Sequence, residues 1–350
     1  MRVVVIGATG NVGTALLRAL ATEDAVDAVL GVARRRPGTL VPKTTWAAAD
    51  IVRDDLAPLL RGADCVVHLA WLIQPGRDES VTRAVNVEGS ARVFDAAARA
   101  GVPAIVYASS VGTYAAGPKD RAVDESWPAT GIGSSFYSRH KAAVERHLDA
   151  FEREHPDVRV VRLRPGLIFQ RDAASEIRRL FVGPLLPSPL VRRELIPIVP
   201  RHPRLVFQAV HADDVADAYR RAIVDPDARG AYNVAADPVL DADVLGRLLD
   251  ARPVPVSAGL LRAGAALTFR LRLQPSEPGW LDMGLGVPVM DSGRARRELG
   301  WAPRYTAEDA FRELFDGLRA SAGHPTPPLD PRAGGPLRAR EFVTGVGGRP

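Results

Sequence analysis

Cysteine is almost missing from this chain of 350 residues, which contains only Cys65. A single thiol excludes an intramolecular disulfide, and its place inside an apolar run fits a reducing compartment. The seven histidines show no zinc-ligand spacing, since His140 and His147 stand seven residues apart on a predicted helix. The sequence therefore predicts a protein without a metal site.

Long apolar runs are missing as well. No stretch of about 18 uninterrupted apolar residues occurs, which argues against a membrane span. The first residues enter an apolar strand pattern directly, without the basic segment and cleavage site of a leader. We therefore expect a cytoplasmic protein that does not associate with a membrane.

Aromatic residues make up only 6% of the chain, and the net charge of +5 comes almost entirely from scattered arginines. A nucleic-acid surface would need a concentrated basic stripe with interleaved aromatic residues. A mixed-charge, solvated surface is the better interpretation. The expected partner is a small-molecule substrate and not a nucleic acid.

Short apolar runs alternate with helical patterns through the first half of the chain. The predicted strands are Arg2–Ile6, Val26–Val32, Thr45–Ala49, Cys65–Ala70, Ala104–Ala108 and Val158–Leu163, and the predicted helices are Asn11–Thr22, Glu79–Ala100 and Ser134–Glu154. Uninterrupted Val/Ile runs separated by helices are typical of a parallel sheet buried on both faces. The right-handed crossover rule then predicts a doubly wound α/β sheet.

The pattern becomes less regular after residue 165. We assign residues 1–165 to the core, 166–322 to a smaller substrate lobe interleaved with the last core elements, and 323–350 to a disordered tail rich in Pro, Gly and Arg. The later strands are expected at Leu205–Val210 and Ala231–Val234, and the later helices at Asp213–Ile223, Asp241–Ala251, Gly259–Leu271, Ser292–Leu299 and Ala307–Ala320.

A glycine-rich segment directly follows the first strand and opens the first helix: Gly7-Ala8-Thr9-Gly10-Asn11-Val12-Gly13. Glycines there permit a tight turn and a close approach of backbone to a pyrophosphate, and the helix N-terminus offers unpaired N–H groups. Strand, loop and helix in this order predict a dinucleotide-binding sheet of the Rossmann type. The alternative is a structural turn in an unrelated α/β protein.

The end of the second strand bears on the choice of dinucleotide. An NAD site places an acid there for the ribose 2′-hydroxyl, whereas an arginine accommodates a 2′-phosphate. Ala33 takes the place of the acid and Arg34 follows it, which favours NADP over NAD. The competing interpretation is a solvated arginine cluster.

Two further segments are candidates for contact with the dinucleotide. Asp50 and Ile51 follow the third strand, where Asp50 can accept from the adenine amino group. Asp50 could equally cap a helix that begins near Asp54. Leu69 and Ala70 end the fourth strand, where small apolar residues let the dinucleotide lie flat.

Tyr137 and Lys141 stand four residues apart on one face of a predicted helix. A phenol has an ordinary pKa near 10, and a neighbouring ammonium or an oxidised nicotinamide lowers that pKa toward a working acid/base. Ser109 and Ser110 follow the strand Ala104–Ala108, at the carboxyl edge where ligands bind in such sheets. Each of these residues could also be purely structural: the tyrosine could pack in the core, the lysine could be solvated, and the serines could be turn residues.

Together the motifs resemble the extended short-chain dehydrogenase/reductase family, which includes the NAD-dependent epimerase/dehydratase enzymes. The motifs are Gly7-x-x-Gly10-x-x-Gly13, His68-Leu69-Ala70, Asn86-Val87-Glu88-Gly89, Ser109-Ser110, Tyr137-x-x-x-Lys141 and Leu163-Arg164-Pro165. The resemblance covers about residues 1–220 and again 290–318.

By this resemblance Tyr137 is the catalytic acid/base, and Lys141 binds the ribose and tunes the tyrosine. Ser110 orients the substrate oxygen, and is chosen over Ser109 because it lies four residues before Tyr114. Asn86 would brace the site's backbone and water. The resemblance also implies a cofactor contact at Pro165 and a homodimer.

Two departures from the family pattern bear on the reaction. Family dehydratases carry acids directly after the serine or threonine, whereas Val111 and Gly112 stand here. Nucleotide-sugar enzymes usually have an asparagine after the Leu-Arg motif, whereas this chain has Leu167, with Gln170 where glycine is common. We therefore expect hydride transfer at a carbonyl or alcohol carbon, with a sugar epimerase on tightly held NAD and a non-catalytic dinucleotide sensor as alternatives.

Overall fold

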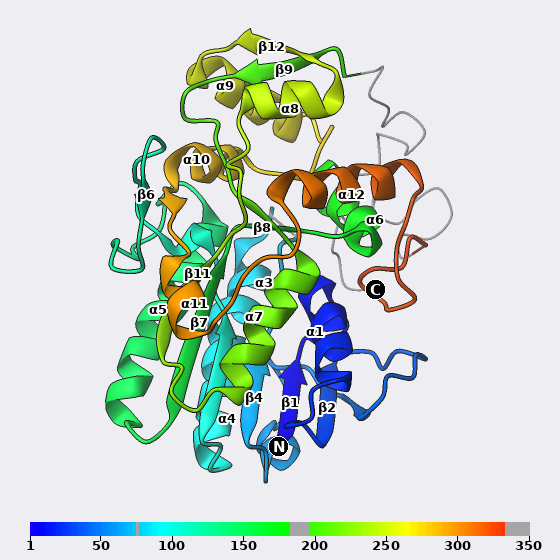
Figure 1. The fold of residues 1–350 in the computed structure, drawn as a ribbon, viewed down its shortest axis with the longest axis vertical. Coiled ribbons are helices and arrows are strands. Elements are labelled where there is room, and N and C mark those ends of the chain that lie inside the picture. The colour runs from blue at the N-terminus through cyan, green and yellow to red at the C-terminus, as the bar shows by residue number, and fades with distance from the viewer. Residues whose placement is uncertain (75–76, 183–195, 333–350) are drawn as a thin grey trace.

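Seven parallel strands form one sheet in the lower half of the molecule (Figure 1). The structure, a computed structural model, describes residues 1–74, 77–182 and 196–332. Across the sheet the order is β3-β2-β1-β4-β5-β7-β11, which confirms the doubly wound α/β class. The strands are β1 (Arg2–Ile6), β2 (Ala28–Ala33), β3 (Thr44–Ala48), β4 (Cys65–His68), β5 (Ala104–Ala108), β7 (Arg159–Pro165) and β11 (Gly230–Val234).

Both faces of the sheet are buried because successive strand residues point to opposite sides. Val3 and Val5 of β1 join one apolar core, whereas Val4 and Ile6 join the other. The first core is covered by α1 (Asn11–Ala21), α7 (Ala212–Val224) and α11 (Gly293–Glu298). The second is covered by α2 (Ala57–Leu60), α4 (Ser90–Arg99) and α5 (Phe136–Glu154).

The long helix predicted after β4 is present but contains a wider turn. It runs as α3 (Glu79–Arg83), a π-helical turn (Ala84–Gly89) and α4. Such π turns often accompany functional sites because they redirect a few side chains without breaking the helix. Here the turn carries Asn86, which is fully buried.

A smaller lobe lies above the carboxyl edge of the sheet (Figure 1). Its paired strands are β8 (Leu167–Phe169) with β10 (Ala209–His211), and β9 (Ile198–Arg201) with β12 (Arg252–Pro255); β6 (Ala122–Val123) pairs with β13 (Val289–Met290). Its helices are α6 (Ala174–Ile177), α8 (Ala242–Leu249), α9 (Ala258–Arg270), α10 (Pro278–Gly286) and α12 (Ala307–Arg319). The expected strand Leu205–Val210 overlaps β10, whereas the other short strands, α6 and α10 escaped the sequence prediction.

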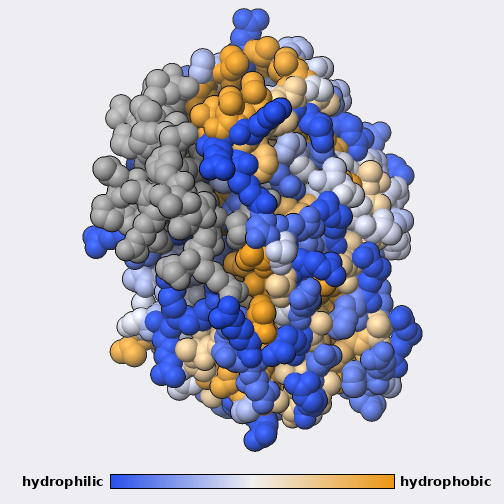
Figure 2. Space-filling model, turned by 180° about the vertical axis from the view of Figure 1, so that it is seen from behind, coloured by the Kyte–Doolittle hydropathy of each residue, from blue (hydrophilic) through white to orange (hydrophobic). Residues whose placement is uncertain are grey.

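Apolar side chains gather at the top of the lobe in Figure 2, where α9 lies. Leu260 and Leu267 of α9 are more than half exposed, and so is Leu271 directly after it. None of the helices that the structure describes is both long and apolar enough to span a membrane.

Residues 323–332 pack against the core. Leu329 is fully buried, and the Thr326 hydroxyl donates to the Thr9 carbonyl at 2.9 Å. The prediction of a disordered tail is therefore wrong for this stretch, because one leucine and one threonine anchor it despite its Pro- and Gly-rich composition. The remainder of the predicted tail, residues 333–350, lies outside the described residues.

Candidate active site

The glycine loop after β1 lies against the segment that follows β4. Gly7 adopts φ +89°, and a Cβ there would stand 2.6 Å from the Ala70 nitrogen and 2.8 Å from the Leu69 carbonyl carbon. A Cβ on Gly13 would stand 2.6 Å from the Gly7 oxygen. Both positions therefore require glycine, and the two loops form one continuous main-chain surface at the carboxyl edge of the sheet.

The N-terminus of α1 opens onto this surface. Gly10 is its N-cap residue, and no side chain of the described residues caps the helix there. A helix of this length presents unpaired N–H groups and a positive dipole end to an anion. A Cβ on Gly10 would meet only the Gly7 oxygen, at 3.6 Å, so the space in front of the helix is free of close protein atoms. These features fit the pyrophosphate of a dinucleotide.

Residues that are far from the glycine loop in the sequence hold it in place through hydrogen bonds. The Gln170 amide donates to Asn11 Oδ1 at 2.7 Å and to the Asn11 carbonyl at 2.9 Å. Asn11 Nδ2 in turn donates to the Ile168 carbonyl, and Thr326 holds the Thr9 carbonyl. Asn11 and Thr9 thus stabilise the loop, and Gln170, the departure from the family pattern, is the residue that anchors it.

At the nucleoside end, Ala33 is buried and Arg34 is exposed directly after β2. Val12 is half-buried in the first turn of α1. Pro165 is the last residue of β7 and lies buried opposite Val234 of β11, at the same edge of the sheet. The candidate cofactor residues therefore lie along one edge, as the order of parallel strands requires.

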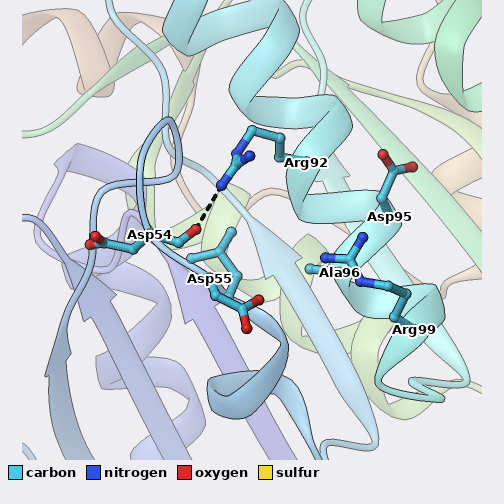
Figure 3. Close-up of a pocket in the computed structure, with 7 residues that line it drawn as sticks. Asp54, Asp55, Arg92, Asp95, Ala96 and Arg99 are labelled. Atoms are coloured by element: carbon cyan, nitrogen blue, oxygen red, sulfur yellow. Dashed lines mark hydrogen bonds between the residues drawn. The ribbon is translucent and has the colours of Figure 1, made fainter.

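Asp50 and Ile51 lie on a turn and not on a helix. Asp50 Oδ1 accepts from the Val52 N–H at 2.9 Å, and α2 begins only at Ala57, so the alternative that Asp50 caps a helix beginning near Asp54 is wrong. Arg92 of α4 donates to the carbonyls of Ile51 and Asp54, the second of which Figure 3 shows. The turn is thereby held in place beside a small polar pocket of about 120 Å³.

Tyr137 and Ser110 form the polar centre of the site. Ser110 is buried after β5, and its side chain hydrogen-bonds Tyr137 in the first turn of α5. Burial raises the pKa of Tyr137 to about 12, and the hydrogen bond from Ser110 opposes that rise. The protein alone therefore keeps this phenol protonated at neutral pH.

Lys141 lies one turn further along α5, but its ammonium points away from the tyrosine. Lys141 Nζ donates to the Ala108 carbonyl at 2.6 Å and stands 3.5 Å from the centre of the Trp71 ring. Its distance from the Tyr137 ring centre is 5.8 Å. The expectation that this ammonium lowers the pKa of Tyr137 is wrong for the protein alone, because burial dominates and the charge is directed elsewhere.

The two serines after β5 point to different partners. Ser109 Oγ donates to Glu145 Oε1 at 2.5 Å, and Glu145 forms a buried pair with Arg164 through bonds of 2.9 and 2.5 Å. Burial lowers the pKa of Lys141, and the Glu145 carboxylate opposes that change. Ser109 thus belongs to an ionic network beneath the site, whereas Ser110 faces Tyr137.

Asn86 supports the loop that follows β4. Its Nδ2 donates to the Leu72 carbonyl at 2.8 Å, and its Oδ1 accepts from the Leu72 N–H at 2.7 Å. The sequence predicted a brace for backbone and water, and the backbone partner is Leu72. Asn86 therefore positions the neighbouring Trp71.

Sequence reasoning missed two aromatic residues that lie against Tyr137 and a third that packs behind one of them. Trp71 lies edge-on to Tyr137 with ring centres 5.8 Å apart, and Trp280 of α10 lies 4.8 Å away. Phe181 packs edge-on against Trp280 at 4.9 Å. We call these three residues, Trp71, Phe181 and Trp280, the aromatic wall. A signal existed for α10, because Pro278 in its first turn is a common start of a helix.

Comparison with known proteins gives a family and a fold. The model of the NAD dependent epimerase/dehydratase family matches residues 3–235. Uncharacterized protein Rv2047c of Mycobacterium tuberculosis is 28% identical over 326 residues, which cover 92% of this chain and 31% of that protein. This chain therefore spans less than a third of that relative's length.

Two other similarities concern proteins with a named activity. The 3-beta-hydroxysteroid dehydrogenase of Mycolicibacterium neoaurum is 25% identical over 325 residues, covering 83% of this chain and 86% of that protein. The UDP-glucose 4-epimerase of Thermus thermophilus, solved in complex with NAD, matches with a TM-score of 0.67 at 21% identity. That match covers 92% of this chain and all of the epimerase chain, and it shows a shared fold.

Proposed function

This chain belongs to the NAD-dependent epimerase/dehydratase family of enzymes, and we propose that it is an NAD(P)-dependent oxidoreductase that moves a hydride at a carbonyl or alcohol carbon. The observation that carries the proposal is the hydrogen-bonded pair of Tyr137 and Ser110 at the carboxyl edge of the sheet. Lys141 lies one helical turn beyond Tyr137, and the glycine loop opens at the same edge.

The glycine loop would hold the dinucleotide. Its pyrophosphate would bind the first turn of α1, where Gly10 leaves room, and its flat face would lie on the main chain of Leu69 and Ala70. When bound, the nicotinamide ring supplies the hydride chemistry. Lys141 would give up its bond to the Ala108 carbonyl to hold the ribose.

Tyr137 would supply the proton. A phenol with a pKa of about 12 is protonated at pH 7, so it is prepared to donate to the oxygen of a carbonyl substrate. Ser110 would hold that oxygen in place through its hydroxyl. In the opposite direction Tyr137 must first lose its proton, and the positive charge of an oxidised nicotinamide favours that loss. The protein alone therefore presents the protonated phenol that reduction of a carbonyl uses.

The choice of dinucleotide would be made at the end of β2. Arg34 follows the buried Ala33, which stands where an NAD site has its acid, and this order of residues supports NADP. The solved epimerase carries NAD, but its 21% identity gives no guide to this position. We infer NADP as the preferred cofactor and NAD as the weaker one.

A sugar epimerase is the second candidate, because 92% of the chain shares its fold with a UDP-glucose 4-epimerase. An epimerase oxidises and reduces the same carbon, so its NAD is held through the whole cycle. An oxidoreductase must exchange its cofactor in each cycle. Tight NAD that survives purification would therefore support the epimerase. A non-catalytic sensor is the weaker alternative, because it would not need the Tyr137–Ser110 pair.

Calorimetric titration of the purified chain with NADPH and NADH tests the proposal. We expect both to bind and NADPH to bind more tightly. A screen of ketones, aldehydes and alcohols, followed by nicotinamide absorbance, then identifies the reacting class. If neither dinucleotide shows affinity, the proposed function is wrong.

A further inference from the structure

The aromatic wall is a built feature. The Gln74 amide, itself buried, donates to the Leu180 carbonyl at 2.9 Å and to the Pro275 carbonyl at 3.3 Å. Ser276 Oγ donates to the Phe181 carbonyl at 2.9 Å. These bonds tie together three segments that are far apart in the sequence, since Gln74 lies 106 residues from Leu180 and 201 residues from Pro275. The wall is thus held against Tyr137 by specific polar contacts.

Within the described part of the chain, two indole N–H donors of the wall have no acceptor. Trp71 Nε1 and Trp280 Nε1 are both shielded from solvent, and neither has a hydrogen-bond acceptor among the described residues. A buried donor left without an acceptor costs about 1–3 kcal/mol, so such atoms usually have a partner. Two indole N–H groups beside the same tyrosine indicate that a ligand supplies an acceptor.

The chemistry of the wall is unsuited to a phosphate. Trp71, Phe181 and Trp280 offer aromatic faces and N–H donors, whereas a diphosphate requires cations or helix N-termini. Glu277 adds a carboxyl group next to α10, where its Oε1 accepts from the Phe136 N–H. Lys141, the cation in contact with the wall, already donates to the Ala108 carbonyl.

Gly112, two residues after Ser110, has no room for an acidic side chain either. A Cβ on Gly112 would stand 2.9 Å from Met283 Sδ and 2.9 Å from the Tyr137 ring. Tyr137 therefore contacts the rings of Trp71 and Trp280, and the Met283 thioether lies near Gly112 beside it. Such surroundings favour flat, apolar molecules, since aromatic pairs gain from stacking and edge contacts beyond the burial of area.

We propose that the aromatic wall binds the substrate, and that the substrate is a flat apolar ketone or alcohol with fused or aromatic rings and no phosphate. Its reacting oxygen lies between Tyr137 and Ser110. A second acceptor on the ring system takes the N–H of Trp71 or Trp280. The proposal rests on the proposed function, because it takes Tyr137 as the proton donor to that oxygen.

Calorimetry on the full chain, saturated with the dinucleotide that it binds more tightly, separates the substrate classes. The apolar probes are 6-hydroxy-1-tetralone, 6-hydroxy-2-naphthaldehyde and dehydroepiandrosterone, each of which carries a second oxygen besides the reacting one, and the polar probe is UDP-glucose. We expect at least one ring compound to bind and UDP-glucose not to bind. Binding of UDP-glucose, or failure of every ring compound up to its solubility limit, would overturn the proposal while leaving dinucleotide binding intact.

Variants assign the binding to the wall. We expect Trp280→Leu to weaken the binding of the ring compound about tenfold, because stacking and buried area are lost. Trp280→Phe retains a ring but loses the donor, so its loss should be smaller. Trp46→Phe is the control, because Trp46 lies on β3 and donates to the Thr39 carbonyl.

The affinity for the dinucleotide should be the same in all of these variants, which shows that they fold. Unchanged affinity for the ring compound in both Trp280 variants would overturn the assignment. Loss of dinucleotide binding in the unmodified chain would instead refute the proposed function, and this proposal with it.

Discussion

The glycine loop and the aromatic wall are built in opposite ways, although they meet at two consecutive residues. Ala70 touches the glycine loop with its main chain, and Trp71 faces Tyr137 with its ring. The loop is a main-chain surface made by elements adjacent in sequence. The wall is a side-chain surface made by three distant segments tied through Gln74.

The difference explains what each half can recognise. A main-chain surface with a helix N-terminus binds a phosphate group that many ligands share, so it needs few particular side chains. A side-chain surface binds one shape, and its residues can change without disturbing the sheet. The cofactor half therefore follows from the fold, whereas the substrate half is specific to this chain.

The largest expected effect comes from Tyr137→Phe, which removes the proton donor between the two halves. We expect turnover of an identified substrate to fall about 10²–10⁴-fold, the usual contribution of a positioned acid/base. The affinity for the dinucleotide should hardly change, because the phenyl ring of the variant still packs against Trp280. Steady-state rates measure the loss of turnover, and calorimetry measures the affinity for the dinucleotide.

A suitable comparison is Ser109→Ala, which removes a hydroxyl that points to Glu145 and not to Tyr137. Its effect on turnover should be far smaller than that of Tyr137→Phe, although it disturbs the network beneath the site. Equal losses in the two variants would mean that Tyr137 acts only through the structure.

The second prediction concerns substitutions in the glycine loop, the main-chain half of the site. Gly7→Ala adds a Cβ at φ +89° and 2.6 Å from the Ala70 nitrogen, which we expect to cost about 3 kcal/mol of stability. Gly10→Ala is its matched control, since φ is −83° and the nearest atom would be 3.6 Å away. Gly10→Ala should keep its stability within about 1 kcal/mol and lose affinity for the dinucleotide. Urea unfolding with calorimetry tests both, and equal stability losses would contradict this view of the loop.

The two halves also differ in how far the sequence revealed them. Strand and helix periodicity predicted β1, α1 and β5 to within a residue, because each is a continuous local pattern. The glycine loop was predicted with them, since its spacing is local as well. The wall was missed because Trp280 approaches Tyr137, and Phe181 approaches Trp280, only through tertiary packing.

Some details of the cofactor half were beyond the sequence too. The π turn at Ala84–Gly89 leaves no periodic mark in an otherwise helical run. The pKa of Tyr137 was expected to be low from the Lys141 spacing, yet burial raises it. Spacing along a helix shows which residues share a face, but it does not show where a long side chain ends.

The third prediction concerns His68, the buried last residue of β4, which comes shortly before Ala70 and Trp71 in the chain. Burial, with help from the Lys141 charge, lowers the pKa of His68 from 6.5 to about 3. Below pH 6.5 the unfolded state binds a proton that the folded state does not, so stability falls as the pH decreases toward 3. At pH 5 this single group should cost about 2 kcal/mol relative to pH 7.

Urea unfolding of His68→Phe measures that contribution. The variant loses the 2.8 Å bond between His68 Nε2 and Ser90 Oγ, so it should be less stable at pH 7 but less sensitive to acid. His202→Asn, on the loop after β9, provides the comparison and should retain the acid sensitivity of the unmodified chain. An unchanged pH dependence in His68→Phe would show that other groups cause the loss.

The smallest expected effect comes from Arg34, which directly follows β2 at the edge of the main-chain surface. Arg34 is an exposed side chain beside a surface otherwise made of backbone, so its contact with a 2′-phosphate would be screened by water and salt. Arg34→Ala should therefore weaken NADPH only about fivefold, or about 1 kcal/mol, and leave NADH unchanged. Arg35 is also exposed, so Arg35→Ala is the matched control and should change the affinity for neither dinucleotide.

Calorimetry at two salt concentrations checks the assignment, because the difference in NADPH affinity between the unmodified chain and Arg34→Ala should shrink as the salt concentration rises. If the ratio of NADPH to NADH affinity is the same before and after Arg34→Ala, the arginine belongs to the solvated surface and cofactor choice is made elsewhere.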